Sequence, residues 1–349
     1  MKKTLFYPAL PVFLWLLSHC VIHAQTQLAA FKDDNGLWGY INKKGEVVIE
    51  AKYSNIKAFS RDGLALVKEK KSKEFVYINS KGDELKLDCT PDRFGNFSEG
   101  RAMVRINEKW GYIDTEGKLV IEAKYTNTTD FYSGKAIVQN EAGKVLVIDK
   151  AGVEIDVTGL GITDFKEFSE GLAPVRINDG NWGFLSLDGK LAIEASYVRV
   201  GYFTAGLAWV RTGDDQVGFI DKSNNLVIKP VYVAVKEFDP VSERARVKNS
   251  AGEWLYINKE GSELRVDADH FGDFSEGLCS LDQSSNSGVY GFIDKEGKWV
   301  IEPKFEATGD FHLGVCRVRN NKLWGFIDKD GNVIIETKFD GVHDFAPID

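Results

Sequence analysis

Residues Phe97 to Tyr125 read FSEGRAMVRINEKWGYIDTEGKLVIEAKY, and this stretch recurs along the chain. Residues 168–197 read FSEGLAPVRINDGNWGFLSLDGKLAIEASY, and residues 311–339 read FHLGVCRVRNNKLWGFIDKDGNVIIETKF. The Trp-Gly position can be followed with spacings of 34 to 37 residues, at positions 38, 75, 110, 145, 182, 217, 254, 290 and 324. Self-similarity at a fixed period is the sequence signature of a repeat protein. We therefore predict one array of about nine units, which fills residues 25–349 and leaves no room for a second domain.

Each unit combines short strand-like segments with glycine turns. In the copy at residues 97–125, apolar and polar residues alternate in RAMVRI, in WGYID and in KLVIE, as expected of half-buried strands. Asp114 to Gly117 joins the second segment to the third. An Asp opens a type I turn, and a Gly supplies the left-handed position that closes a hairpin. The expected unit is a three-stranded antiparallel meander of roughly 35 residues, too small to bury its own apolar face.

Two arrangements of such units suit this all-β pattern: an open solenoid or superhelix, and a closed ring like a β-propeller. The chain ends just past Phe345, where a tenth unit has barely started. No complementary half-units are evident at the two ends, and nine blades exceed the usual number. We expect the open array and keep the closed ring as the alternative.

The recurring residues are similar to those of a known family. The core WG[YF]I[DN]xxG, the following VIEAKY or VIEPKF, and the FSEGLAxV lead-in resemble the WG repeat family of bacterial proteins. The resemblance covers essentially all of residues 25–349. It implies a β-repeat array and almost nothing about activity, because the family name records a sequence pattern and not a reaction.

The first two dozen residues differ from the rest. Lys2 and Lys3 precede an apolar stretch from Leu5 to Leu17, which is the layout of a secretion signal and is too short for a transmembrane helix. We predict a signal peptide at residues 1–24. The alternative is a lipoprotein signal, with a lipid anchor on Cys20. Either reading places the mature protein outside the cytoplasm, in the periplasm or at the cell surface, with no membrane span.

The charge and the cysteines narrow the function classes. Loss of residues 1–24 removes Lys2 and Lys3 and no acidic residue, so the net charge falls from −8 to −10. An acidic surface repels phosphate, so neither nucleic acid nor an anionic membrane is an expected partner. Cys279 and Cys316 occupy a slot that holds a small residue, such as Ala102, in other units. We expect buried free thiols there, with a disulfide between them as the alternative.

No catalytic, cofactor or metal-binding motif is recognisable in the sequence. The Asp-x-x-Gly turns, of which Asp328 to Gly331 is the closest to a calcium loop, mostly carry Lys between Asp and Gly, so we assign them to turn formation. Glu99, Glu170 and Glu276 of the FSEG segments could line one face, but a solvated turn is the simpler expectation. We predict no enzyme activity, no cofactor and no metal.

The tryptophans of the Trp-Gly position are expected to pack between units. Trp209 and Trp299 lie outside that position. We expect them to pack as well, and they are the candidate contacts for a sugar or a peptide if they face outward. We predict a non-catalytic exported repeat protein that binds proteins or envelope polymers. The alternatives are a carbohydrate- or cell-wall-binding protein and a hydrolase, which would need carboxylates converging in the centre of a ring.

Overall fold

A computed structural model describes residues 26–283 and 288–349. The signal peptide predicted at residues 1–24, with Cys20, lies outside this part of the chain. Apart from one 3₁₀ turn, η1 (Thr158–Leu160), the regular structure of the described residues is all strand. Among these residues, no helix is long and apolar enough to cross a membrane. The predicted all-β repeat array is confirmed.

The repeated unit is a four-stranded antiparallel sheet, and nine such units make up the described residues. Unit 6 shows the plan: β17 (Arg199–Val200), β18 (Leu207–Arg211), β19 (Val217–Asp221) and β20 (Leu226–Tyr232) pair in chain order. The predicted three-stranded meander therefore lacked one strand. The additional first strand is only two residues long here and follows the fourth strand of the preceding unit across a bend, so its alternation is too short to recognise.

The remaining strands follow in chain order, with units 1 and 2 sharing β3 and units 3 and 4 sharing β9. Units 1 and 2 hold β1 (Thr26–Lys32), β2 (Trp38–Asn42), β3 (Val47–Ile56), β4 (Leu64–Glu69) and β5 (Phe75–Asn79). Units 3 and 4 hold β6 (Arg93–Ser98), β7 (Arg101–Ile106), β8 (Lys109–Asp114), β9 (Leu119–Thr128), β10 (Lys135–Asn140), β11 (Val145–Asp149) and β12 (Glu154–Asp156). Unit 5 holds β13 (Ile162–Phe165), β14 (Leu172–Ile177), β15 (Trp182–Ser186) and β16 (Leu191–Tyr197). Unit 7 holds β21 (Ala234–Val235), β22 (Arg244–Lys248), β23 (Trp254–Asn258) and β24 (Glu263–Leu264). Unit 8 holds β25 (Phe271–Ser275), β26 (Leu278–Asp282), β27 (Tyr290–Ile293) and β28 (Trp299–Phe305). Unit 9 holds β29 (Ala307–Thr308), β30 (Val315–Asn320), β31 (Leu323–Asp328) and β32 (Val333–Phe339), and β33 (Gly341–Val342) and β34 (Ala346–Ile348) end the chain.

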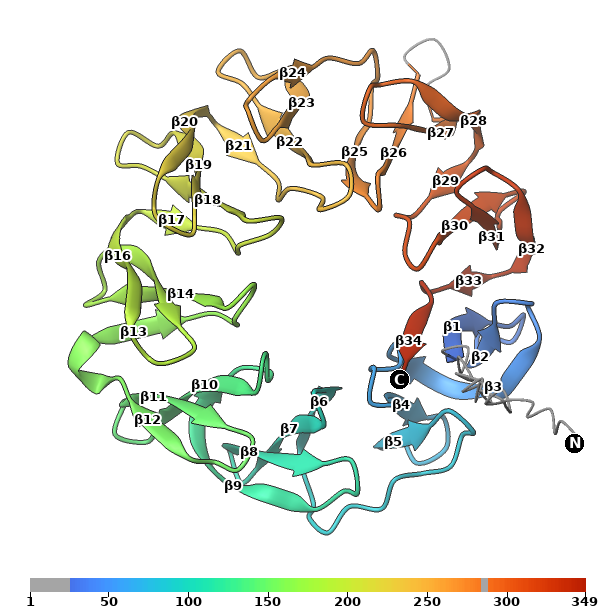
Figure 1. Cartoon of the computed structure of the whole chain (residues 1–349). Helices are drawn as coiled ribbons and strands as arrows, with labels where there is room; N and C mark the ends of the chain where they lie inside the picture. Colours follow the sequence, from blue (N-terminus) through green and yellow to red (C-terminus); the bar gives the residue numbers. More distant parts are fainter. Residues whose placement is uncertain (1–25, 284–287) are drawn as a thin grey trace, which may run out of the picture.

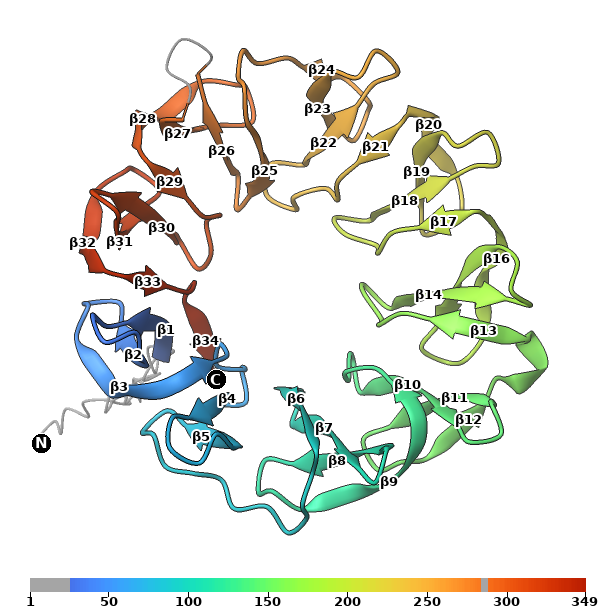
Figure 2. The ribbon, with the colours of Figure 1, turned by 180° about the vertical axis from the view of Figure 1, so that it is seen from behind.

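The units follow one another around a closed circle (Figures 1 and 2). Strands β33 and β34 lie antiparallel to β1, with Phe31 opposite Val342 and Leu28 opposite Ala346. They supply the first strand of unit 1, so the two ends of the array meet within one sheet. The expectation of an open array is thus wrong, and the closed ring is the arrangement that the structure adopts. The closing half-unit is the segment GVHDFAPI, which carries no FSEG turn of its own and so is hard to recognise as part of a repeat.

The seam between units 9 and 1 is packed like the other junctions. At an ordinary junction, Phe184 on the third strand of unit 5 meets Phe203 of unit 6 with ring centroids 4.8 Å apart. At the seam, Phe326 and Phe345 meet in the same way at 4.9 Å. Ile335 of unit 9 also packs against Gly45 of unit 1, as Ile301 packs against Gly331 between units 8 and 9. The seam is therefore held by the same kinds of contact as these ordinary junctions.

The Trp-Gly pair has a steric reason. The fourth strand changes register opposite this pair, because Trp182 faces Tyr197 while Phe184 faces Ile193. A β-carbon on Gly183 would lie 2.4 Å from the carbonyl oxygen of Ile193. Only glycine lets the bulged fourth strand pass this close.

Candidate binding grooves between units

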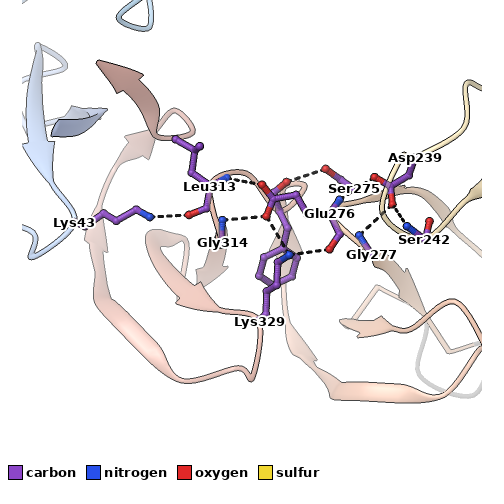
Figure 3. Close-up of polar contacts among 10 residues, drawn as sticks. Lys43, Asp239, Ser242, Ser275, Glu276, Gly277, Leu313, Gly314 and Lys329 are labelled. Atoms are coloured by element: carbon purple, nitrogen blue, oxygen red, sulfur yellow. Dashed lines mark hydrogen bonds and ion pairs between the residues drawn. The ribbon is translucent and has the colours of Figure 1, made fainter. Parts of the chain in front are cut away.

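The carboxylates of the FSEG segments connect neighbouring units. The Glu276 carboxylate of unit 8 accepts hydrogen bonds from the backbone N–H groups of Leu313 (2.7 Å) and Gly314 (3.0 Å). These two residues form the turn between the first and second strands of unit 9, here called its first turn. Lys329 Nζ lies 3.2 Å from the same carboxylate (Figure 3). Burial alone would raise the pKa of Glu276, but these N–H groups and Lys329 outweigh it and hold the pKa below its ordinary value. Ser275 Oγ donates to the carbonyl oxygen of Phe311 at 2.8 Å.

The same clamp recurs around the ring. Glu99 accepts from the N–H groups of Ser133 and Gly134 at 2.7 and 2.8 Å, and Glu170 accepts from the N–H of Gly206 at 3.1 Å. These glutamates were expected to be solvated turn residues. They do lie in turns and Glu99 is exposed, but their carboxylates also cap the turn of the next unit, which the sequence did not predict. A turn that is capped by the preceding unit cannot be recognised from one unit alone.

The seam keeps part of this belt of contacts. Lys43 of unit 1 donates to the carbonyl oxygen of Leu313 at 2.6 Å, as Lys329 donates to the carbonyl oxygen of Glu276 at 2.8 Å (Figure 3). Leu313 stands where the other turn has Glu276. Unit 1 has no first turn to cap, because the two ends of the array meet there.

The Asp-x-x-Gly turns have the predicted structural role. Asp328 Oδ1 accepts from the N–H groups of Asp330 (3.0 Å) and Asn332 (2.8 Å), and the other Asp turns bond in the same way, as at Asp114. Within the described residues, no group of three His, Cys, Asp or Glu side chains is placed to hold a metal ion.

One groove differs from these sites, in which charged side chains bond within turns or to the neighbouring unit. A cavity of about 560 Å³ lies between units 5 and 6, which is within the size range of small-ligand sites. We call it the units 5–6 groove; its lining residues are Lys166, Arg176, Gly180, Asn181, Trp182, Val198, Arg199, Val200 and Trp209.

Trp209, a candidate contact from the sequence, lines this groove. Its indole is half-buried and lies over Gly201, where a β-carbon would be only 2.1 Å from the indole Nε1. The same Nε1 donates to Glu237 Oε1 of unit 7 at 3.3 Å. The ring is therefore held in place on one side and contributes to the groove on the other. Trp182 of unit 5 lines the same groove and packs on a core cluster shared by units 5 and 6.

Lys166 crosses the groove from unit 5 to unit 6. Its ammonium donates to the carbonyl oxygen of Val200 at 3.2 Å and lies over the rings of Trp182 (5.2 Å) and Tyr202 (5.6 Å). Burial lowers the pKa of Lys166, although the charges of Asp164 and Glu237 act in the opposite direction.

Arg176 differs from the arginines at the same strand position in other units. Arg105, Arg211 and Arg319 each pair with a carboxylate, at 2.6, 2.7 and 3.6 Å. Arg176 instead donates to the carbonyl oxygens of Gly180 (3.1 Å) and Asp179 (2.7 Å) in its own hairpin loop.

The cationic side chains of the groove form no ion pair among the described residues. Arg199 is exposed at its rim. Within the described part of the chain, neither Lys166, Arg176 nor Arg199 has a carboxylate oxygen within the 4.0 Å of an ion pair. The groove thus brings together three cationic side chains that form no ion pair, although the charges of Asp164 and Glu237 act on Lys166 from farther away. Lys166, Arg176 and Arg199 were not singled out from the sequence, because each lies in a segment that otherwise follows the repeat.

Trp299, the other candidate contact, lies in unit 8. It takes the strand position that Val333 has in unit 9, since Ile293 faces Trp299 as Ile327 faces Val333. Trp299 is half-buried and packs on a cluster that includes Leu264 and Val266 of the irregular tail after unit 7. A smaller cavity of about 270 Å³ lies beside it. The two candidate tryptophans therefore lie in separate grooves.

The cysteines are free thiols, as expected. Cys279 and Cys316 are buried in the cores of adjacent units, and Cys89 is half-buried. Burial raises the pKa of Cys279 to about 12. These thiols act as small apolar side chains.

Comparison with known proteins agrees with the repeat pattern. The model of the family described as WG containing repeat matches residues 38–72, 77–110, 110–144, 182–214, 218–254, 290–324 and 324–346. No curated protein matches the sequence. Among solved structures, BamB from Moraxella catarrhalis is similar at 10% identity and a TM-score of 0.42, over 88% of this chain and 90% of that chain. The computationally designed Ika8 protein is similar at 13% identity and a TM-score of 0.41, over 88% of this chain and 95% of that chain. The dihydro-heme d1 dehydrogenase NirN is similar at 12% identity and a TM-score of 0.44, over 80% of this chain and 74% of that chain. Since the family model covers more than half of the sequence, this chain belongs to the WG containing repeat family.

Proposed function

We propose that this protein is an exported, non-catalytic scaffold that binds its ligand in the units 5–6 groove. This proposal rests on three cationic side chains that line the groove beside Trp182 and Trp209. They are Lys166, Arg176 and Arg199, and none of them forms an ion pair with a described residue. By contrast, the arginines at the strand position of Arg176 in three other units, Arg105, Arg211 and Arg319, each pair with a carboxylate. Charge without a partner in a concave site favours a ligand as the missing partner.

A binding role suits the rest of the molecule better than hydrolysis. A second cavity of about 600 Å³, near the seam, is lined by Asp310, Asp344, His312, His343 and Arg317. Asp344 is paired with Arg317 at 3.4 Å, and the His343 ring packs against Trp38 with ring centroids 4.6 Å apart and planes tilted by 45°. Burial lowers the pKa of His343. An ion-paired carboxylate and an imidazole packed against a tryptophan are suited to holding the seam together more than to exchanging protons with a substrate.

Ligand capture tests the proposal. The full chain is expressed, the processed protein is recovered, and its capture of components from envelope extracts is compared with that of Arg199→Gln. Arg199 is exposed and has no partner within the described residues, so its loss should leave the fold intact. We expect capture that falls in the Arg199→Gln variant and persists in Arg105→Gln, the same type of substitution outside the groove. Capture that is the same in wild type and Arg199→Gln would remove the groove as the binding site.

The export part of the proposal has its own test. Sequencing the N-terminus of the recovered protein should begin at Gln25, as cleavage after Ala24 requires. A lipid-modified Cys20 at the N-terminus would replace this with the anchored form. An unprocessed Met1 in the cytoplasmic fraction would contradict export altogether.

A further inference from the structure

Resting on the proposed function, we infer that the units 5–6 groove binds an acidic oligosaccharide, a chain of sugar rings that carry carboxylate or sulfate groups. The inference follows from three properties of the groove. Its cationic side chains have N–H groups without a partner among the described residues, its lining includes two indole rings, and its edge strand is too short for a peptide to pair with.

The groove has donors for an anionic group. Arg176 uses Nε and Nη2 on backbone carbonyl oxygens, which leaves Nη1 without a partner among the described residues. Lys166 uses one of its three N–H groups on the Val200 carbonyl oxygen. Arg199 is exposed and adds a second guanidinium. Guanidinium groups bind carboxylate and sulfate-like oxygens through paired, charge-assisted hydrogen bonds.

The groove also has apolar faces for a ring. Trp182 of unit 5 and Trp209 of unit 6 line the groove, together with the exposed side chain of Val198. An indole offers a large rigid apolar face at little cost in conformational entropy. A sugar ring presents one face of C–H groups and a rim of polar groups, so it can contact an indole while its acidic substituent reaches a cation.

An extended peptide is the weaker match. A peptide would add to a free strand edge, and the edge strand here, β17, has only two residues, Arg199 and Val200. The carbonyl oxygen of Val200 is already bonded to Lys166. The wall therefore lacks the row of backbone groups on which strand addition depends.

Binding of defined oligomers tests the inference by calorimetry on the processed full chain. The probes are an oligogalacturonate, the same oligomer with methyl-esterified carboxylates, a sulfated oligosaccharide, and a polyglutamate peptide. We expect the oligogalacturonate or the sulfated oligosaccharide to bind, with an affinity that falls as salt rises, because the contact is ionic. The stronger of these two probes identifies the acidic group. The esterified oligomer should bind at least about tenfold more weakly, since it loses a charge-assisted hydrogen bond.

Variants locate the binding. Arg176→Gln and Arg199→Gln should each weaken binding of the acidic probe about tenfold. Trp209→Phe, which keeps an aromatic ring over Gly201, should weaken it less than Trp209→Ala. Arg105→Gln, at the strand position equivalent to Arg176, should have no effect.

Separate outcomes contradict the inference and the proposed function. Equal binding of the esterified and free oligomers, or binding of polyglutamate alone, would overturn the acidic-sugar inference while leaving a groove that binds ligands. Failure of every probe would also overturn it. Binding of the acidic oligomer that is unchanged in Arg176→Gln, Arg199→Gln and Trp209→Ala would instead place the site elsewhere and remove the proposed role of the groove.

Discussion

Replacing Phe345 with alanine should destabilise the protein by about 3–5 kcal/mol, although this residue is the fifth from the end of the chain. Phe345 is 1% exposed and packs 4.9 Å from Phe326, in a cluster that includes Ala29 and Ile41 of unit 1. A phenylalanine in a frayed terminal segment would make no such contacts, and its loss would change the unfolding free energy by less than about 0.5 kcal/mol. The size of the effect therefore reports whether the ring is closed.

Phe203→Ala is the matched control, because Phe203 is fully buried at the ordinary junction between units 5 and 6. Both variants are unfolded in urea and followed by tryptophan fluorescence, and hydrogen exchange of the β1 amides is measured in the native state. Similar losses for both variants, with faster exchange in β1 for Phe345→Ala, agree with a closed ring. A large loss for Phe203→Ala beside a negligible one for Phe345→Ala would refute the closure.

Three further predictions concern single side chains. Glu276→Gln should lower the free energy of unfolding by about 1–3 kcal/mol at pH 7 and by less near pH 3, because the pKa of Glu276 is held below its ordinary value. The contribution of the carboxylate is present above the unfolded pKa of about 4.3 and is lost on acidification. Urea unfolding at both pH values measures this difference. The pKa of Asp130 is raised to about 6 by burial and then by the charge of Glu167, so the contribution of Asp130 to stability falls as pH rises from about 4 to about 6. Asp130→Asn should therefore melt higher than the wild type at pH 7.5 and equally below pH 4. Cys279 and Cys316 should resist a thiol reagent in the native protein and react fully in denaturant, and a disulfide joining them in the native protein would contradict their separate buried positions.

The sequence predicts the repeated features of this fold well. The Asp-x-x-Gly turns, the strand alternation and the free cysteines all depend on residues close together in one unit, so their physical causes are visible in each copy. The Gly183 position is of the same kind, because the bulged strand that needs it lies within the same unit.

Contacts between units are harder to predict, because each partner looks ordinary alone. Glu276 resembles any glutamate in a turn until the N–H groups of the next turn are placed beside it. In the sequence, Phe345 reads as the start of a tenth unit, whereas in the ring its segment supplies the first strand of unit 1. In the groove, Trp209 stands out as a departure from the repeat, whereas Arg176 becomes unusual only when the carboxylate partners of the equivalent arginines are known.

The place where the chain begins and ends in the ring is interchangeable with other places. Thr26 of β1 lies opposite Ile348 of β34. The two ends of the array thus meet where every other unit has a turn between its first and second strands. A short linker carrying a Ser-Glu-Gly turn would join these ends, and a new opening at the Glu170 turn would give a circular permutant with unchanged neighbours in space. The covalent order of the units is therefore separable from their order around the ring, which the contacts between neighbouring units determine.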